Sequence, residues 1–175
     1  IADRRLHAYS CAQPGRAAAA KYMEGLKVAV VVGGDYGALS FVRHPEDVLA
    51  CRGHLESLGC KAQVVAKLEK LEAIRNLDKI LEVADAVMVA RGDLGVELKL
   101  GELPAVQKDV IDRANRAGVP VITATEMLES MVTSTRPTRA EPSDVAHPHW
   151  AGPDPWRLAP ETTGVSTPLA RFPPS

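Results

Sequence analysis

AQVVAKLEKLEAIRNLDKILEVADAVMVARGDLGVEL, residues 62–98, is the stretch of sequence that decides the fold. It begins with a short apolar run at 62–68, continues with apolar residues at helical spacing, and reaches a second apolar run at 86–90. Short apolar runs are typical of buried strands, whereas apolar residues three or four apart mark one face of a helix. The stretch therefore predicts a strand, a helix and a second strand.

The same alternation continues on both sides of this stretch. Upstream, an apolar run at 36–42 precedes a helical pattern that starts near Pro45 and ends at Gly59. Proline fits the first turn of a helix, and glycine fits the position just past its end. Downstream, a helix closed by Gly118 leads to a fourth run at 120–125. Strands separated by amphipathic helices predict a parallel α/β sheet.

Polar side chains gather where the predicted strands end, which is where a barrel places its chemistry. A doubly wound sheet also fits the alternation, but the first strand is not followed by the GxGxxG turn of a dinucleotide-binding fold. We therefore expect an α/β fold that is part of a (β/α)8 TIM barrel, with about four βα units. The polar residues at the strand ends are Ser40, Arg43, Lys67, Glu69, Arg91, Asp93, Thr125 and Glu126.

Composition divides the chain into three stretches. Residues 1–23 are rich in alanine and arginine, and we expect an irregular or helical N-terminal segment. Residues 24–146 carry the regular pattern and form the predicted partial barrel domain. Residues 147–175 hold seven prolines in 29 residues, so we expect an irregular tail.

Charge and hydropathy narrow the class of protein. The formal net charge is −1, which argues against a nucleic-acid or membrane partner attracted by bulk charge. No apolar run approaches the roughly 18 residues of a membrane helix, and the N-terminus does not resemble a secretory signal. Three cysteines without a CxxC pair indicate reduced thiols and a cytoplasmic protein. Because the first residue is Ile1, we expect the sequence to start inside a longer reading frame.

Lys67 and Glu69 are the first candidates for chemistry. They lie two apart at the end of a predicted strand, so their side chains project to the same side. Two interpretations fit this spacing. The two residues form a structural ion pair, or Glu69 binds a metal while Lys67 stabilises developing negative charge.

Two further strand ends carry candidates. Asp93 follows a buried strand between Gly92 and Gly95, which allows the backbone to approach a ligand, although a plain helix N-cap also fits. Thr123 and Thr125 share one face of the last strand, and the hydroxyl at its end fits phosphate binding or proton relay as well as strand packing. Two carboxylates on successive strand ends beside a lysine predict magnesium-assisted chemistry on an anionic substrate.

The remaining motifs are weaker candidates for a functional site. His147 and His149 are spaced for metal binding but lie in the proline-rich tail, where exposure to solvent is the simpler interpretation. Met127 and Met131 fit a core, and residues 136–141 fit either a solvated loop or a subunit contact.

Several longer motifs resemble the pyruvate kinase family: YGALSFVR, AKLEKLEAI, VMVARGDLGVEL, VQKDVIDRANRAGVPVITATEMLESM and RPTRAEPSDVA. They occur in the family's order and cover residues 24–146. The resemblance implies transfer of phosphate from phosphoenolpyruvate to ADP, giving pyruvate and ATP in glycolysis. It also implies Mg²⁺ and K⁺ as cofactors and a homotetramer.

The resemblance also implies roles for individual residues. Lys67 would stabilise the transferring phosphoryl group and the enolate, and Glu69 and Asp93 would bind magnesium. Gly92, Asp93 and Thr125 would hold the substrate, and Thr125 is further implicated in protonating the enolate. Lys70 and Glu126 depart from the family, which commonly has asparagine and glutamine there.

The resemblance covers barrel strands four to seven and stops at position 147. Strands one to three, which hold the potassium and nucleotide ligands, the lid domain, strand eight and the regulatory domain have no counterpart in this sequence. We therefore expect a truncated or frame-disrupted chain that is unstable or self-associating, and inactive as a kinase alone. Three other interpretations remain: a non-catalytic half-barrel that binds magnesium and anions or a partner chain, another magnesium-dependent barrel enzyme such as an aldolase or mutase, and a decayed gene product.

Overall fold

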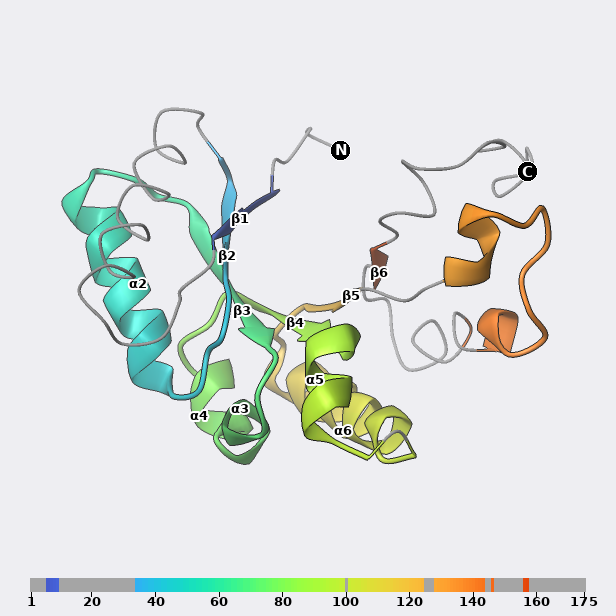
Figure 1. Ribbon diagram of the computed structural model, residues 1–175. Coiled ribbons are helices and arrows are strands. Elements are labelled where there is room, and N and C mark those ends of the chain that lie inside the picture. Colours follow the sequence, from blue (N-terminus) through green and yellow to red (C-terminus); the bar gives the residue numbers. More distant parts are fainter. Residues whose placement is uncertain are drawn as a thin grey trace.

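The computed structural model describes residues 6–9, 34–99, 101–124, 128–143, 146 and 156–157. Its strands form one sheet in which every neighbouring pair is parallel and the strand order follows the chain (Figure 1). The strands are β1 Leu6–Tyr9, β2 Tyr36–Leu39, β3 Gln63–Leu68, β4 Ala86–Ala90, β5 Val121–Ala124 and β6 Trp156–Arg157.

Helices lie between successive strands from β2 to β5 and pack on the sheet. Figure 1 shows α2, α4 and α6 along the same outer side of the curved sheet, with α5 next to the end of β4. The helices are α2 Pro45–Ser57, α3 Leu71–Arg75, α4 Leu77–Leu81, α5 Arg91–Glu97 and α6 Leu103–Ala117, and a 3₁₀ helix, η1, spans Glu129–Val132.

The order of the strands distinguishes the two α/β architectures that the sequence left open. A doubly wound sheet reverses its strand order at a switch point, whereas a barrel wall proceeds from one strand to the next. The described sheet runs from β1 to β6 without a reversal. The expectation of an α/β fold that forms part of a barrel is confirmed, and the described strands form an open wall of it.

The sheet has two different faces because side chains alternate along each strand. The main core lies between one face and the helices, where Leu39, Leu68 and Val89 pack with residues of α2, α4 and α6. The opposite face carries a small cluster built from strand residues alone. This second face corresponds to the barrel interior, and its cluster consists of Ala38, Val65, Ala86, Met88 and Ala124, with Tyr36 and Ile122 packed against them.

The ends of the helices follow the local sequence. Pro45 occupies the first turn of α2, and Asp47 Oδ2 accepts the backbone N–H groups of Arg43 and His44 at 2.9 and 3.0 Å. Gly118 ends α6 in the left-handed conformation, with φ of +70°, which glycine adopts without strain. Pro45 and Gly118 were both predicted from the sequence, and both are confirmed at these positions.

Several boundaries differ from the sequence-based prediction. The single helix expected across Ile74 and Leu81 is two short helices, because the backbone of Asn76 departs from the helical conformation, with φ of −99° and ψ of 12°. The Asn76 side-chain amide donates to the Arg43 carbonyl at 2.9 Å. The run at 36–42 ends as a strand at Leu39, since Phe41 has a φ of +57°. The helix that Asp93 could have capped begins earlier, at Arg91.

Two short strands were not predicted. β1 lies within the segment expected to be irregular or helical, and β6 lies within the proline-rich tail. Both occupy the edges of the described sheet, where short strands and proline-rich neighbours are tolerated. Most of the N-terminal segment that was expected to be irregular or helical, from residue 10 onward, falls outside the described residues.

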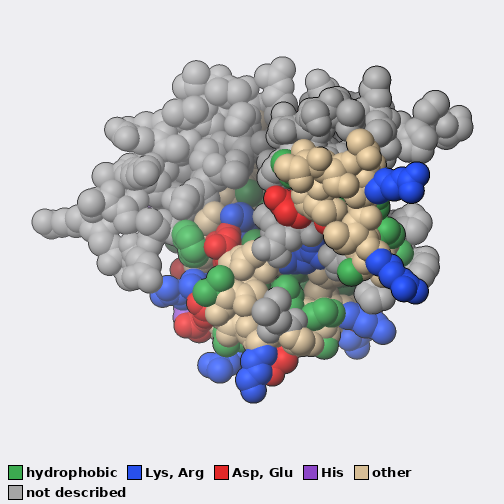
Figure 2. All heavy atoms as spheres, turned by 45° about the vertical axis from the view of Figure 1, so that its right-hand side comes forward, with side chains coloured by type: hydrophobic (Ala, Val, Ile, Leu, Met, Phe, Trp, Pro, Cys, Tyr) green, Lys and Arg blue, Asp and Glu red, His purple; other side chains and the backbone are tan. Residues whose placement is uncertain are grey.

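The distribution of surface charge and the hydropathy of the helices are those of an ordinary folded domain. Figure 2 shows lysine and arginine side chains dispersed over the visible face, with acidic side chains among them. Within the part of the chain that the structure describes, no helix is both long enough and apolar enough to cross a membrane. Among the described residues, no disulfide involves Cys51 or Cys60.

Candidate active site

Lys67 and Glu69 lie at the carboxyl end of β3, and the Lys67 ammonium forms an ion pair with Glu69 Oε1. Lys67 alternates with Ala66 and Leu68, which face the helices, so it belongs to the barrel-interior face. The geometry predicted from the spacing is therefore present. An ion pair is common to both interpretations of these residues, and their catalytic role stays a prediction.

Ser40 is the second partner of Lys67. Leu39 of β2 is paired with Ala66 of β3, so the next residue, Ser40, comes beside Lys67. The Lys67 ammonium donates to Ser40 Oγ at 3.1 Å. Ser40 is buried and follows the last residue of its strand, so its hydroxyl is fixed at the same edge of the sheet.

Glu69 is the most deeply buried acidic residue of the site, at 1% exposure. Its Oε2 accepts the backbone N–H of Phe41 at 2.7 Å, while Oε1 faces Lys67. A buried carboxylate is unfavourable unless it is paired and hydrogen-bonded, and here each oxygen has a partner. Phe41 donates this bond from a left-handed backbone that costs a residue other than glycine about 1–2 kcal/mol.

Asp93 lies in the first turn of α5, directly after β4. The N-cap residue of α5 is Ala90, so Asp93 is not the N-cap that the sequence suggested as the simple interpretation. Asp93 is exposed, whereas Arg91 at the start of the same helix is buried. The carboxylate of Asp93 is thus accessible to a ligand at the edge where β3 and β4 end.

An ion pair connects the two candidate carboxylates through their neighbours. Lys70 Nζ lies 2.6 Å from Glu97 Oε1, and both side chains are about one-quarter exposed, at 27% and 28%. Lys70 directly follows Glu69, and Glu97 lies one helical turn beyond Asp93. The pair therefore ties α5 to the end of β3.

The threonine candidates have separate outcomes. Thr125 lies outside the described residues. Thr123 pairs with Val89, a residue of the helix-facing core, whereas Ile122 and Ala124 belong to the interior face. Thr123 therefore faces the helices and is buried at 1% exposure, so the packing interpretation holds for it.

The carboxylate oxygens at the strand ends are of the type that magnesium prefers as ligands. Magnesium takes oxygen ligands, commonly one or two carboxylates completed by substrate oxygens and water. Glu69 and Asp93 supply carboxylates at adjacent strand ends. Among the described residues, no three side chains of histidine, cysteine, aspartate or glutamate gather in one place, so the protein would contribute only part of the coordination.

Sequence reasoning missed what the Ser40–Phe41 turn does. Ser40 was recognised as a polar residue at a strand end, but its contact with Lys67 depends on the register of two strands 27 residues apart. The role of Phe41 rests on its backbone, which no side-chain pattern reveals. A turn residue that is neither glycine nor asparagine gives no warning of a positive φ.

Fold and site together define a class: an α/β barrel wall with a buried lysine–glutamate pair and an accessible aspartate at the carboxyl ends of its strands. A family model described as "Pyruvate kinase, barrel domain" matches residues 14–170. The chain therefore belongs to the pyruvate kinase family. The match begins before and ends after the 24–146 range over which the motifs were recognised in the sequence.

Individual relatives agree with this assignment. The chain is 49% identical over 153 residues to "Pyruvate kinase 2" of Synechocystis sp., covering 87% of this chain and 25% of the relative. It is 51% identical over 150 residues to "Pyruvate kinase" of Mycobacterium tuberculosis, covering 86% and 32%. A relative from Bacillus licheniformis is 50% identical over 138 residues, covering 78% and 24%. The chain thus spans about a quarter to a third of the length of these relatives.

Proposed function

We propose that this chain supplies part of the catalytic barrel of a pyruvate kinase, which transfers a phosphoryl group from phosphoenolpyruvate to ADP. The observation that carries the proposal is the Lys67–Glu69 pair, held at the carboxyl end of the barrel wall with Asp93 nearby along the same edge. In this reaction the P–O bond of phosphoenolpyruvate breaks and a new P–O bond forms to the terminal phosphate of ADP. The enolate left behind takes a proton at carbon and becomes pyruvate.

Lys67 is proposed to stabilise the reacting groups electrostatically. Phosphoryl transfer depends mainly on positioning and on neutralising charge, because little covalent chemistry is left to the protein. The Lys67 side chain is four-fifths buried, so its charge acts in a medium where charges interact more strongly than in water. Its third N–H is available to an oxygen of the phosphoryl group or the enolate.

Glu69 and Asp93 are proposed as the magnesium ligands. When bound, magnesium would neutralise charge on the phosphoryl oxygens. Gly92 and Asp93 are proposed to hold the substrate through the backbone at the start of α5, and Thr125 through its hydroxyl, with a part in protonating the enolate. Potassium, a homotetramer and a cytoplasmic location belong to the proposal through the family resemblance.

We further propose that the 175-residue chain does not turn over phosphoenolpyruvate by itself. A TIM barrel needs eight strands for closure, and the described sheet has six, two of them very short at its edges. The competing function is a half-barrel that binds magnesium and anions without catalysis. Pyruvate formation, followed through a coupled dehydrogenase, separates kinase activity from binding alone.

Binding of phosphoenolpyruvate to the 175-residue chain, measured by titration calorimetry with and without Mg²⁺, tests the site. We expect binding that requires Mg²⁺ and weakens at least about tenfold in Lys67→Met, since a hydrogen bond from a charged donor is lost. Lys61→Met, at an exposed lysine just before β3, is the matched control and should bind like the parent. Equal affinity in Lys67→Met and the parent, or binding indifferent to Mg²⁺, would count against the proposal.

A further inference from the structure

Two residues outside the proposed catalytic groups hold both members of the Lys67–Glu69 pair. Ser40 and Phe41 form the turn after β2, and each contacts a different charge: Ser40 Oγ accepts from Lys67, and the Phe41 N–H donates to Glu69. We propose that the Ser40–Phe41 turn is a positioning device that fixes the ammonium and the carboxylate before any ligand arrives. The inference rests on the proposed function, because the fixed pair matters for chemistry only where it meets an anionic substrate.

Ser40 limits what Lys67 is able to do. An ammonium group has three N–H donors. One donates to Ser40 Oγ at 3.1 Å and one faces Glu69 Oε1, so within the described part of the chain a single donor is left for a substrate oxygen. Ser40 is only 6% exposed, and its place is set by the pairing of Leu39 with Ala66. The serine thus converts a flexible side chain into a donor with one direction.

Phe41 does the same for Glu69. Its N–H reaches Oε2 at 2.7 Å, which together with Lys67 gives each carboxylate oxygen one partner. A carboxylate offers about four lone-pair sites, so each oxygen keeps one for a ligand. Glu69 is therefore both fixed and still able to bind.

The backbone of Phe41 is an independent indication of function. Its φ of +57° is unfavourable for a side chain with a Cβ, and such outliers cluster at sites where geometry matters. Phe41 is 36% exposed, so its ring is not part of the buried core. The conformation is accounted for by the N–H that it aims at Glu69.

The mobility of the Lys67 side chain tests the role of Ser40. The 175-residue chain is labelled at lysine 13Cε, the Lys67 signal is identified by its loss in Lys67→Arg, and its relaxation is measured without Mg²⁺ or phosphoenolpyruvate. We expect Ser40→Ala to make the Lys67 side chain markedly more mobile and Ser40→Thr to restore the parent behaviour. Ser57→Ala, which removes an exposed serine hydroxyl bonded to the His54 carbonyl, should leave Lys67 unchanged. Unchanged mobility in a folded Ser40→Ala chain would overturn the proposal.

A second measurement needs no variant and covers the case in which Ser40→Ala does not fold. The Phe41 amide of the parent chain should exchange with solvent far more slowly than an open turn residue, because it is bonded to a buried carboxylate. Exchange at the rate of an unprotected amide would show that the turn does not hold Glu69, and would overturn the proposal.

Binding then separates this inference from the proposed function. If the parent binds phosphoenolpyruvate with Mg²⁺, Ser40→Ala should weaken that binding by about tenfold, and Ser40→Thr should stay near the parent. Equal binding in Ser40→Ala and the parent would remove the positioning role. If the parent does not bind phosphoenolpyruvate while Ser40→Ala still frees Lys67, the proposed function fails and the positioning of the pair stands.

Discussion

The guanidinium of Arg52 and the carboxylate of Asp85 lie 2.8 Å apart, between Nη2 and Oδ2, and join α2 to the start of β4. The same Asp85 oxygen accepts the backbone N–H of Val64 at 2.7 Å, and Arg52 also donates to the Val83 carbonyl at 2.8 Å. One carboxylate thus ties a helix to two neighbouring strands at the end of the sheet opposite the proposed site.

Replacing Asp85 should destabilise the fold. In Asp85→Ala, the Val64 N–H and one Arg52 donor lose their shared acceptor, and we expect a loss of about 2 kcal/mol in the free energy of unfolding. Asp85→Asn keeps an acceptor oxygen and should lose less. Urea denaturation measures both, with Asp112→Ala on the exposed side of α6 as the control. Equal unfolding free energies for Asp85→Ala and Asp112→Ala would contradict this assignment.

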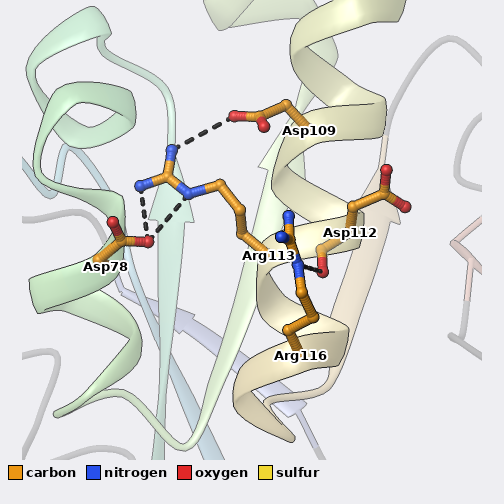
Figure 3. A network of polar contacts seen from close by, with 5 residues as sticks. All are labelled: Asp78, Asp109, Asp112, Arg113 and Arg116. Carbon is orange, nitrogen blue, oxygen red and sulfur yellow. Dashed lines mark hydrogen bonds and ion pairs between the residues drawn. The ribbon is translucent and has the colours of Figure 1, made fainter.

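Arg113 connects α6 to α4 in a network that is drawn in Figure 3. Its Nη2 lies 2.7 Å from Asp78 Oδ1, and its Nη1 lies 3.3 Å from Asp109 Oδ2. Partial burial acts to lower the pKa of Arg113, but the bonds to the two aspartates outweigh it, so its pKa is raised and it remains a cation. These contacts are near the surface and accessible to salt.

We therefore expect Arg113→Ala to lose about 1 kcal/mol of stability at low salt and less at 1 M salt, because screening weakens exposed ion pairs. Arg116→Ala is the matched control, since the hydrogen bond that Arg116 Nε makes within the described residues is to the Asp112 carbonyl of its own helix, at 3.1 Å. Thermal unfolding at the two salt concentrations is the measurement. A loss that does not change with salt would assign the effect to packing.

Glu141 should titrate far below an ordinary glutamate. Partial burial acts to raise its pKa, but hydrogen bonds from the side chains and backbone N–H groups of Ser130 and Thr138 outweigh this and lower the pKa from 4.5 to about 2. Because the folded pKa is depressed, the stabilisation is present above about pH 4.5 and is lost as pH falls toward about 2. A carboxyl midpoint near 2 in an NMR titration is the expected result.

The lowered pKa of Glu141 can also be tested by a substitution. Glu141→Gln should cost stability at pH 7 and less at pH 3, where the unfolded parent is already mostly protonated at this position. A midpoint near 4.5, with an equal cost at both pH values, would show that the contacts with Ser130 and Thr138 do not persist in solution.

Much of the barrel wall was predictable because its signals are local. The β4 strand was predicted at its observed bounds, since its five apolar residues in a row have a charged residue directly before and directly after them. The break in the helix at Asn76 was harder to predict. The Asn76 side chain bonds to the Arg43 carbonyl, which is distant in the sequence. The edge strand β1 was missed because its pairing with β2, from Leu6↔Tyr36 onward, leaves no period in the sequence around it.

The candidate site divides in the same way. Lys67 and Glu69 could be predicted from their spacing of two on one strand, and in the structure they form an ion pair. The contribution of Ser40 required the register between β2 and β3, and that of Phe41 required a backbone angle. The charged residues of the candidate site could therefore be predicted from the sequence, whereas the groups that orient their side chains depend on tertiary structure.

The Lys70–Glu97 ion pair should matter to the site more than to stability. Ion pairs that solvent reaches contribute little to folding, but this partly buried one ties the helix that carries Asp93 to the strand end that carries Glu69. We expect Lys70→Glu to weaken Mg²⁺-dependent binding of phosphoenolpyruvate several-fold, and the exchanged pair Lys70→Glu with Glu97→Lys to recover most of it. Calorimetric titration of both proteins is the measurement. No recovery in the double variant would show that Lys70 acts through its own charge.

Thr123 offers the sharpest contrast between packing and chemistry. Its hydroxyl is buried and has no hydrogen-bond partner among the described residues. An unpaired buried hydroxyl is unfavourable, so Thr123→Val, which keeps the branched shape, should stabilise the chain by about 1 kcal/mol. Binding of phosphoenolpyruvate should not change in this variant, whereas under the proposed function Thr125→Val should weaken it. Thermal unfolding and calorimetry on the two variants provide the comparison. If Thr123→Val loses binding instead, its hydroxyl serves the site from the helix-facing side, and the assignment of faces around the end of β5 must be revised.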